Sequence, residues 1–376
     1  MAARLTMIIP TLVQGGAEKQ MSLLAAGLPR DQFDVSVCVL THSGPWEAFL
    51  KEQGIAVEVI GKRFKADPIA FGKLVRYLRK TKPDLVHTWI FAANCYGRAA
   101  ARLARIPHIV AGERCVDLWK SEGHFWLDRK LESSTDAIVT NSNGVVDFYV
   151  DHGLSREKFR VIPNGIADLA NAPTDQNTGS RTTARAKWLA KLGLPDDAIL
   201  ALSLARLWPQ KRLKDAIWAL DLVNCTAGNL HLIVAGEGPE RERLEEFARE
   251  TGTEKEVHFV GHQENCSELL QIANMFVLPS EYEGQSNALM EAIQNQIPAV
   301  VSDIPGNRDL IPDDSYGLLF RTGDRAGLAK AMRQVVEQPQ AAASRAVKAQ
   351  ERLASEFSLS RMIESYRQLY HDLLGN

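Results

Sequence analysis

Two cations stand at either end of one short loop, ARLWPQKR, in the second half of the chain. Arg206 follows an apolar run typical of a strand, and Lys211 comes just before a helical pattern begins. Cations there oppose the helix dipole, whose N-terminal end favours anions. An anionic ligand resolves that conflict, and an Arg fork beside a Lys point charge suits a diphosphate. The alternative interpretation is a pair of solvated surface cations.

A second segment, EGQSNALMEAI, carries two carboxylates. We predict a helix that begins near Ser286 or Asn287, with Glu283 in the loop before it and Glu291 within it. Glu291 has apolar neighbours on both sides, so burying it without a partner would be costly. Ligand hydroxyl groups such as those of a ribose are one natural partner. An ion pair with a neighbouring Arg is the alternative, and Glu283 can face the same ligand.

Glycines mark two further turns after strand-like runs. Gly15 and Gly16 let a backbone approach a ligand closely, and the helix predicted from Ala17 offers free N–H groups to a phosphate. The alternative is an ordinary tight turn from strand to helix. The GEGP turn at 236–239 lacks the third glycine of a dinucleotide-binding fingerprint, so we assign it no catalytic role.

The first half of the chain offers polar candidates at the ends of predicted strands. His87 ends the run 85–88, Trp89 and Asn94 follow it, and Arg114 follows the next strand. Ligands bind beyond the carboxyl ends of parallel strands, so these residues are candidates for binding a polar partner. A purely structural role for the lone histidine is the alternative.

Short apolar runs alternate with helical patterns along most of the chain. This rhythm predicts an α/β protein whose parallel strands are covered on both faces. A polar stretch interrupts it and predicts a linker over 168–187, and the last helical pattern has one broad apolar stripe over 360–373. The predicted strands are 5–10, 35–40, 56–60, 85–88, 109–111, 137–140, 160–162, 199–204, 230–235, 257–260, 275–278 and 299–302.

The composition of the chain argues against several classes of function. With 44 basic and 46 acidic residues among 376, the net charge of −2 argues against a chain-wide field for nucleic acid. The five cysteines are far apart and show no C-x-x-C pair, which indicates a reducing compartment without disulfides or structural zinc. The chain shows no signal-peptide pattern and no apolar run of membrane-spanning length, so we expect a cytoplasmic protein.

The first 165 residues differ in charge from the remainder. They hold 22 Lys and Arg against 17 Asp and Glu, a net charge of +5, which hints at an anionic partner. A predicted helix within 63–82 has an apolar face and carries Lys65, Lys73, Arg76, Arg79, Lys80 and Lys82. That pattern suits peripheral contact with an anionic membrane, and the alternative is the solvated side of an ordinary amphipathic helix.

The motifs together form an ordered set. It runs through GGAEKQ, DLVHTWIFAANCYGR, VTNSNGV, VIPNGI, ARLWPQK, GEGP and LPSEYEGQSNALMEAIQNQIPAVVSDIPGNRDLI to GLLF. Over nearly the whole chain it resembles retaining glycosyltransferases of the GT-B fold, glycosyltransferase family 4 (glycosyl transferases group 1). The resemblance implies two Rossmann-like domains facing a cleft. We expect an acceptor domain over 1–167 with the helix 358–376 packed back on it, the linker at 168–187, and a nucleotide-sugar domain over 188–357.

The resemblance also implies roles for individual residues. The catalytic set is Arg206, Lys211 and Glu283, with the two cations holding the diphosphate. The donor-binding set adds Gly15, Gly16, Gly284, Gln285, Ser286, Asn287 and Glu291, of which Glu291 would hold the ribose. The acceptor-binding set is Glu18, His87, Trp89, Asn94 and Arg114. Trp89 stands where many family members have the second histidine of D-x-x-H-x-H, so it either stacks on an acceptor sugar or packs.

The function expected from this resemblance is sugar transfer with retention. The donor would be a UDP- or GDP-sugar, and the acceptor a glycan or lipid-linked molecule of cell-surface polysaccharide synthesis. The chain has no D-x-D motif, so we expect neither a metal nor another cofactor. The alternatives are a GT-B nucleotide-sugar 2-epimerase and a non-catalytic two-domain sugar-binding protein.

Overall fold

The computed structural model describes residues 2–167 and 181–375 and divides into two compact units. Unit 1 consists of Met1–Gly165 and Phe357–Asn376, and unit 2 consists of Ile166–Glu356. The first thirteen residues of the predicted linker, 168–180, lie outside the described residues. Each unit has its own parallel sheet, which confirms the predicted α/β class with two Rossmann-like halves.

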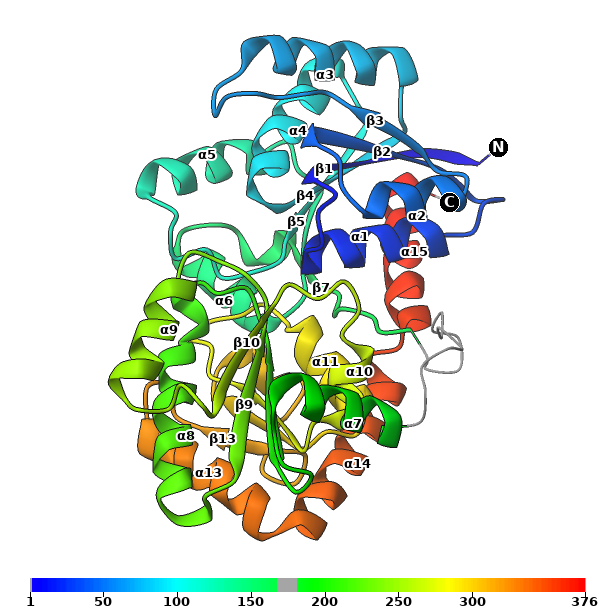
Figure 1. The fold of residues 1–376 in the computed structure, drawn as a ribbon. Helices are drawn as coiled ribbons and strands as arrows, with labels where there is room; N and C mark the ends of the chain where they lie inside the picture. Colours follow the sequence, from blue (N-terminus) through cyan, green and yellow to red (C-terminus); the bar gives the residue numbers. More distant parts are fainter. Residues whose placement is uncertain (1, 168–180, 376) are drawn as a thin grey trace. The chain divides into compact units, whose positions relative to one another are not determined.

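Unit 1 is built on a seven-stranded sheet in the order β3-β2-β1-β4-β5-β6-β7, with every pairing parallel (Figure 1). The order reverses between β1 and β4. The strands are β1 (Ala3–Thr11), β2 (Phe33–His42), β3 (Ala56–Val59), β4 (Leu85–Trp89), β5 (His108–Glu113), β6 (Ala137–Thr140) and β7 (Phe159–Val161). The helices between them are α1 (Gly16–Gly27), α2 (Trp46–Glu52), α3 (Pro68–Thr81), α4 (Ile90–Ala104), α5 (Glu122–Glu132) and α6 (Asn143–Asp151).

The central strand of this sheet shows why the apolar runs of the sequence become parallel strands. Leu5, Met7, Ile8 and Ile9 of β1 are at most 2% exposed. A parallel strand is covered by helices on both faces, so successive side chains are buried on alternate sides and the run reads as continuously apolar. Ile8 joins the core on one side of the sheet, whereas its neighbours Met7 and Ile9 join the core on the other.

The last helix of the chain, α15 (Leu359–Leu374), belongs to unit 1 and packs on α1 (Figure 1). The Ser358 hydroxyl caps its N-terminus by accepting from the Arg361 N–H at 3.3 Å. Met362, Tyr366 and Tyr370 carry the apolar stripe and are at most 3% exposed. Burying aromatic side chains of this size supplies much of the free energy that holds the helix in place.

Unit 2 has a six-stranded parallel sheet in the order β10-β9-β8-β11-β12-β13. Its order reverses between β8 and β11. The strands are β8 (Ile199–Leu204), β9 (Leu230–Ala235), β10 (Val257–Gly261), β11 (Met275–Leu278), β12 (Ala299–Ser302) and β13 (Leu318–Phe320). The helices are α7 (Arg181–Leu192), α8 (Leu213–Ala227), α9 (Arg241–Glu250), α10 (Ser267–Ile272), α11 (Asn287–Gln294), α12 (Pro305–Arg308), α13 (Arg325–Glu337) and α14 (Pro339–Glu356).

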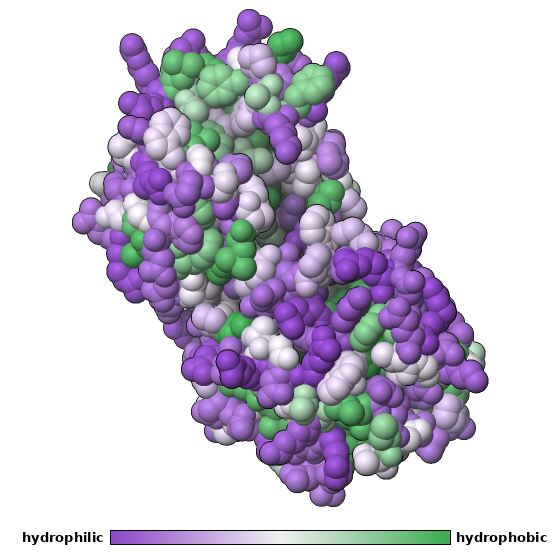
Figure 2. All heavy atoms as spheres, turned by 90° about the vertical axis from the view of Figure 1, so that its left-hand side faces the viewer, coloured by the Kyte–Doolittle hydropathy of each residue, from purple (hydrophilic) through white to green (hydrophobic). Residues whose placement is uncertain are grey.

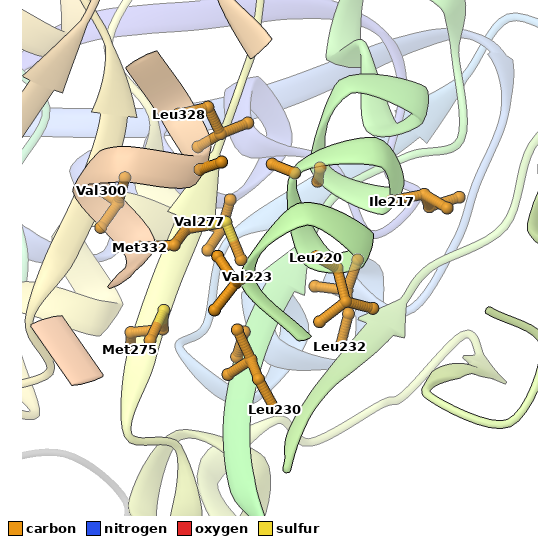
Figure 3. Packing of buried hydrophobic residues seen from close by; sticks show 14 of the residues in the cluster. Ile217, Leu220, Val223, Leu230, Leu232, Met275, Val277, Val300, Leu328 and Met332 are labelled. Atoms are coloured by element: carbon orange, nitrogen blue, oxygen red, sulfur yellow. The ribbon is translucent and has the colours of Figure 1, made fainter. Parts of the chain in front are cut away.

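One continuous core lies between α8, α13 and the middle of this sheet. Figure 3 shows side chains of both helices meeting those of β9, β11 and β12. Leu220, Val277, Leu328 and Met332 are fully buried within it. This packing fixes α8 against the sheet and thereby fixes the loop from which α8 starts.

Two features of unit 2 differ from the prediction. The prediction extended the linker to residue 187, but residues 181–187 form the first part of α7, because Ala184, Trp188 and Leu189 make a buried stripe at helical spacing. The strand β13 was not among the predicted strands. It has only three residues and lies at the edge of the sheet, so its apolar pattern is too short to stand out.

Candidate functional site

The strand order of unit 2 places one crevice where the predicted donor residues lie. β8 and β11 are neighbours, but the chain continues from β8 to one side of the sheet and from β11 to the other. Open α/β sheets bind ligands outside the carboxyl ends of the strands at such a reversal. The loop 205–212 follows β8, and the loop 279–286 follows β11.

The cationic loop is held rigidly between β8 and α8. Leu207 is fully buried and anchors its middle, whereas Arg206 is exposed, with its guanidinium carbon 5.9 Å from the ring centre of Trp208. A short 3-10 helix, Pro209–Lys211, leads to Arg212, which has a φ of 49° and caps α8 without a side-chain bond. The loop therefore presents Arg206 to solvent and Lys211 beside the start of a helix.

The GEGP turn supports this loop from behind. The Leu207 N–H donates to the Glu237 carbonyl at 2.9 Å. A Cβ on Gly236 would lie 1.9 Å from the Ala205 carbonyl oxygen, so only glycine allows the two backbones to approach this closely. The structure therefore shows a packing role for this turn.

The structure brings Lys211 and Glu283 together. The Lys211 ammonium forms an ion pair with Glu283 Oε1, and the two side chains are 13% and 11% exposed. Glu283 Oε1 also accepts from the Ser280 hydroxyl at 2.8 Å. A backbone bond from the Glu281 N–H to the Gln210 carbonyl, 2.8 Å long, joins the same two loops. The cation and the carboxylate are thus already paired and oriented at the crevice.

A buried hydroxyl chain beneath Glu283 escaped the sequence analysis. Ser302 donates to the Ser280 carbonyl at 2.5 Å, and the Asn307 amide donates to the Ser302 carbonyl at 3.0 Å. All three residues have no exposed surface. The sequence did carry one signal, since each of two apolar strands has a serine near its carboxyl end. A buried hydroxyl requires a hydrogen-bond partner, so two such serines indicate a buried hydrogen-bond network. This series of hydrogen bonds connects β11, β12 and α12 to the loop that carries Glu283.

The loop after β11 is also tightly enclosed. A Cβ on Gly306 would lie 1.7 Å from the Gly284 carbonyl oxygen, so α12 and this loop touch backbone to backbone. Helix α11 begins at Asn287 as predicted, and the Ser286 hydroxyl caps it by accepting from the Leu289 N–H at 3.3 Å. Gln285 is 6% exposed within the loop.

Glu291 lies one helical turn beyond Asn287. It is half-buried, as Asn287 is, whereas the apolar neighbours that surround it in the sequence point into the core. Burying this carboxylate without a partner would be costly. The structure leaves part of it accessible on the same side of α11 as Asn287.

In unit 1, the glycine turn after β1 encloses a carboxylate. Gly15 is the N-cap of α1, and Glu18 Oε1 accepts from the Thr11 hydroxyl at 3.0 Å. A Cβ on Gly15 would lie 2.2 Å from Glu18 Oε2. Glu18 is 7% exposed and its negative charge lies in the first turn of α1, where it already satisfies the helix dipole. Gly15 therefore makes room for Glu18. An anion bound beside Gly16 would be repelled by the negative charge of Glu18.

Four residues expected to contact the acceptor are instead buried in unit 1. His87, Trp89 and Asn94 have no exposed surface, and Arg114 is 8% exposed. Nδ1 of His87 is 2.7 Å from the Tyr370 hydroxyl. His87, Trp89 and Asn94 therefore offer a ligand no surface within unit 1, and Arg114 offers little, so their acceptor contacts stay a prediction.

Their partners come from α15 and from the neighbouring strands. The Arg114 guanidinium lies 5.0 Å from the centre of the Trp89 ring and donates to the Tyr366 hydroxyl at 3.0 Å. The Asn94 amide donates to Glu113 Oε1 at 2.8 Å. Of the two alternatives for Trp89, packing is the one that the structure shows.

The burial of His87 predicts a pH dependence of stability. Desolvation, reinforced by the charge of Arg114, holds the pKa of His87 well below its usual 6.5. The unfolded chain then binds a proton below pH 6.5 that the folded chain does not, so this group lowers the free energy of unfolding as the pH falls. Between pH 7.5 and 5.5 the loss is about 1.4 kcal/mol.

The measurement compares urea unfolding of the wild type and His87→Gln at both pH values. Buried carboxyls oppose the histidine, because desolvation raises the pKa of Glu113 and of Asp309 to about 6. These groups are common to both proteins and cancel in the comparison. Equal pH dependence in the two proteins would contradict the assignment.

The helix α3 displays the predicted charge pattern on the surface of unit 1. Leu74, Val75 and Leu78 are buried, whereas Ile69 in the first turn is 73% exposed and Phe64, four residues before the helix, is 69% exposed. Figure 2 shows green hydrophobic side chains among purple ones at the top of this unit, where Figure 1 places α3. All six predicted cations are exposed, but only Lys73, Arg76, Arg79 and Lys80 lie within α3, whereas Lys82 is its C-cap and Lys65 precedes it. Among the described residues, no helix combines the length and apolar character needed to span a bilayer.

Over residues 2–167 and 181–375, no three His, Cys, Asp or Glu side chains are grouped so that they could hold a metal ion. The five cysteines are free thiols.

Two Rossmann-like sheets in one chain, with cations at the order reversal of the second, define the two-unit GT-B class of glycosyltransferases. A solved structure supports this classification of the fold. Anabaena Alr3699/HepE, crystallised in complex with UDP-glucose, superposes with a TM-score of 0.84 at 20% identity, over 98% of this chain and 99% of that one.

Sequence comparison identifies the family. Residues 184–352 match the model of Glycosyl transferases group 1, and residues 14–168 match that of Glycosyltransferase Family 4. Glycogen synthase of Mycobacterium tuberculosis is 34% identical over 308 residues, which is 78% of this chain and 69% of that protein. The UDP-Gal:alpha-D-GlcNAc-diphosphoundecaprenol alpha-1,3-galactosyltransferase of Escherichia coli is 25% identical over 368 residues, 93% and 92% of the two chains. The chain belongs to the glycosyltransferase family that these two models describe, and it is a glycosyltransferase.

Proposed function

We propose that the protein transfers a sugar from a nucleoside diphosphate sugar with retention of anomeric configuration. The observation that carries the donor assignment is the Lys211–Glu283 pair at the order reversal of unit 2. Arg206 and Lys211 would bind the diphosphate, Glu291 the ribose, and Glu283 with the backbone and side chains of 284–287 the transferred sugar. UDP is the nucleotide that the names of the similar proteins favour over GDP.

The chemistry follows from where charge develops. As the bond between the anomeric carbon and the phosphate oxygen breaks, positive charge grows on the sugar and negative charge on the diphosphate. Arg206 and Lys211 would stabilise the leaving diphosphate. An acceptor hydroxyl would bond to the same face of the anomeric carbon, and its proton would pass to the leaving phosphate oxygen. Glu283, already engaged by Lys211 and Ser280, is better suited to orient the sugar than to attack it.

For the acceptor we propose a glycan or lipid-linked molecule of a cell-surface polysaccharide or glycoconjugate. The Escherichia coli relative is named for a diphosphoundecaprenol-linked acceptor. The exposed cations of α3, with Phe64 and Ile69 beside them, suit the headgroups and interfacial region of an anionic membrane. Peripheral binding on the cytoplasmic face would bring the enzyme to such an acceptor.

A binding and turnover panel tests the donor assignment and the metal requirement together. We expect UDP, among UDP, GDP, ADP and free sugars, to raise the melting temperature, by roughly 2–4 °C at a hundredfold excess over Kd. We expect release of UDP from UDP-glucose or UDP-galactose to survive EDTA nearly unchanged. A melting shift with free sugar alone would contradict the donor assignment, and full loss in EDTA would reveal a metal.

Product analysis separates transfer from the alternative chemistry. Incubation with UDP-N-acetylglucosamine and no acceptor should return the donor or its hydrolysis products. A 2-epimer of the sugar would show instead that the same crevice serves an epimerase.

Sedimentation with vesicles tests the membrane contact. We expect the protein to sediment with vesicles that contain phosphatidylglycerol at low salt, and to stay in solution with neutral vesicles or at 0.5 M salt, where charge is screened. Replacing Lys73, Arg76 and Lys80 by Gln should abolish sedimentation, because each cation near the surface contributes about 1 kcal/mol. Equal sedimentation of the triple variant would remove α3 as the contact.

A further inference from the structure

The structure buries the tryptophan that the sequence offered for sugar stacking and exposes another. Trp89 has no exposed surface, whereas Trp119 is 57% exposed. Trp119 lies in the segment 114–121, which leaves the carboxyl end of β5 and leads to α5. Ligands bind at that end of the strands in sheets of this kind.

The Trp119 side chain is held in one orientation. Its indole N–H donates to Asp117 Oδ1 at 3.1 Å. The rings of Phe91 and His124 meet it nearly edge-on, with centre-to-centre distances of 5.1 and 5.3 Å. His124 is itself fixed by the capping box of α5, where its Nδ1 accepts from the Ser121 N–H at 3.0 Å. A large ring that is exposed yet fixed loses little conformational freedom when a ligand stacks on it.

A buried ion network anchors the backbone next to this ring. The Lys120 ammonium, with no exposed surface on its side chain, lies 3.1 Å from Asp128 Oδ2 and 3.5 Å from both Glu113 and Asp117. It also donates to the Tyr149 hydroxyl at 2.8 Å. Burying so many charges is costly unless every one is paired, so the network holds residue 120 firmly. Trp119, its chain neighbour, is directed outward as a result.

The first residue of α4, just before Phe91, is strained. Ile90 has a φ of 58°, a conformation that β-branched residues rarely adopt. Such strain persists only where the surroundings enforce it, and it is concentrated at binding sites. Here it turns the chain sharply from β4 into α4, and Phe91 follows immediately with its ring against Trp119.

We propose that Trp119, supported by Phe91 and His124, is a stacking platform for a sugar ring of the acceptor. A pyranose has an apolar face of C–H groups that packs on an aromatic ring, and its hydroxyls can donate to the neighbouring Asp117 carboxylate, which is 19% exposed. Exposed Glu122 adds a second acidic group nearby in the chain. Two acidic groups favour a neutral, hydroxyl-rich ligand over an anionic membrane.

This inference rests on the proposed transfer reaction, because that reaction requires an acceptor. The test uses saturation-transfer NMR on the full chain with saturating UDP and the methyl α-glycosides of glucose, galactose, mannose and N-acetylglucosamine. With aromatic protons irradiated, we expect saturation of the ring protons of at least one glycoside. Trp119→Ala should lower that signal at least about fivefold, and Trp119→Phe should retain a substantial part of it.

Trp126 provides the matched control, since it is 56% exposed in the same unit. Trp126→Ala should keep the signal within about twofold. Equal loss in both alanine variants, full retention in Trp119→Ala, or no glycoside signal in the wild type would overturn the proposal. So would loss of vesicle sedimentation in Trp119→Ala with glycoside contact intact, which would assign the ring to a membrane.

UDP affinity measured calorimetrically on each variant separates this proposal from the proposed donor site. Unchanged affinity shows that a lost glycoside signal does not come from the donor site of unit 2, and the retained signal of Trp126→Ala and Trp119→Phe shows that unit 1 tolerates such changes. A wild type that binds glycosides through Trp119 but does not bind UDP would refute the donor assignment and leave the platform standing.

Discussion

Replacing Lys211 with methionine is expected to lower kcat by about a hundredfold to a thousandfold, the effect of losing one preorganised charge at a developing anion. Methionine keeps most of the stem of the lysine and removes only the charge. UDP affinity should fall much less than kcat, because the negative charge to be stabilised is greatest as the bond to the diphosphate breaks. Single-turnover kinetics with a UDP-sugar, beside calorimetric UDP binding, separates the two effects.

Lys214→Met is the matched control. Lys214 lies in the first turn of α8, with its ammonium 5.0 Å from the centre of the Phe247 ring, outside the proposed diphosphate site. Its replacement makes the same change in net charge and should leave kcat within about threefold. A similar loss in both variants would show that the charge of the unit matters and not the position of Lys211.

Removal of Lys211 also leaves Glu283 as a nearly buried charge without its cation, which should lower stability. The double variant Lys211→Met with Glu283→Gln should regain that stability without regaining turnover. If turnover returned with stability, the pair would be structural and the proposed role at the leaving group would be wrong.

Replacing Asp128 with asparagine is expected to lower the free energy of unfolding by about 3–5 kcal/mol, the typical effect of breaking a buried ion pair. Asp128 forms an ion pair with Arg98, and both side chains are 1% exposed. It also accepts from Lys120 at 3.1 Å. Asparagine has nearly the same shape, so the loss reports the charge and not the packing.

The control for this prediction is Asp147→Asn in the same unit. Asp147 pairs with Arg156 at 2.9 Å, but the two side chains are 61% and 62% exposed. Water and salt screen that pair, so the expected loss is below about 1 kcal/mol. Urea unfolding at pH 7.5 measures both variants. Equal losses would mean that Arg98 and Lys120 find other partners when Asp128 is neutral.

The sequence allowed the strands and the donor-side loops to be predicted for one physical reason. Strands covered on both faces are continuously apolar, so their ends, and the polar loops behind them, are visible in the sequence. The pairing of Lys211 with Glu283 was not visible, although both residues were singled out. It depends on β8 and β11 being neighbours, which the order of the residues along the chain does not display.

The burial of the predicted acceptor residues could not be foreseen, because it depends on contacts distant in sequence. His87 and Trp89 stand at the carboxyl end of a strand, where a ligand is expected, but Tyr366 and Tyr370 of α15 cover them from nearly 300 residues away. Trp119 was not considered because it lies in a loop without a motif. Its importance depends on Lys120, whose burial among Glu113, Asp117 and Asp128 could not be deduced from spacing.

The return of the chain to unit 1 has a consequence for its biosynthesis. Unit 2 is formed by one continuous segment, whereas unit 1 also requires residues 357–376, which leave the ribosome after all of unit 2. The nascent chain can therefore complete unit 2 while the hydrophobic interior of unit 1 around His87 and Trp89 still lacks its cover. Segments that expose apolar surface during synthesis are prone to aggregate. Nascent chains that stop before α15 are therefore expected to depend on chaperones, whereas chains that include α15 can complete the core of unit 1.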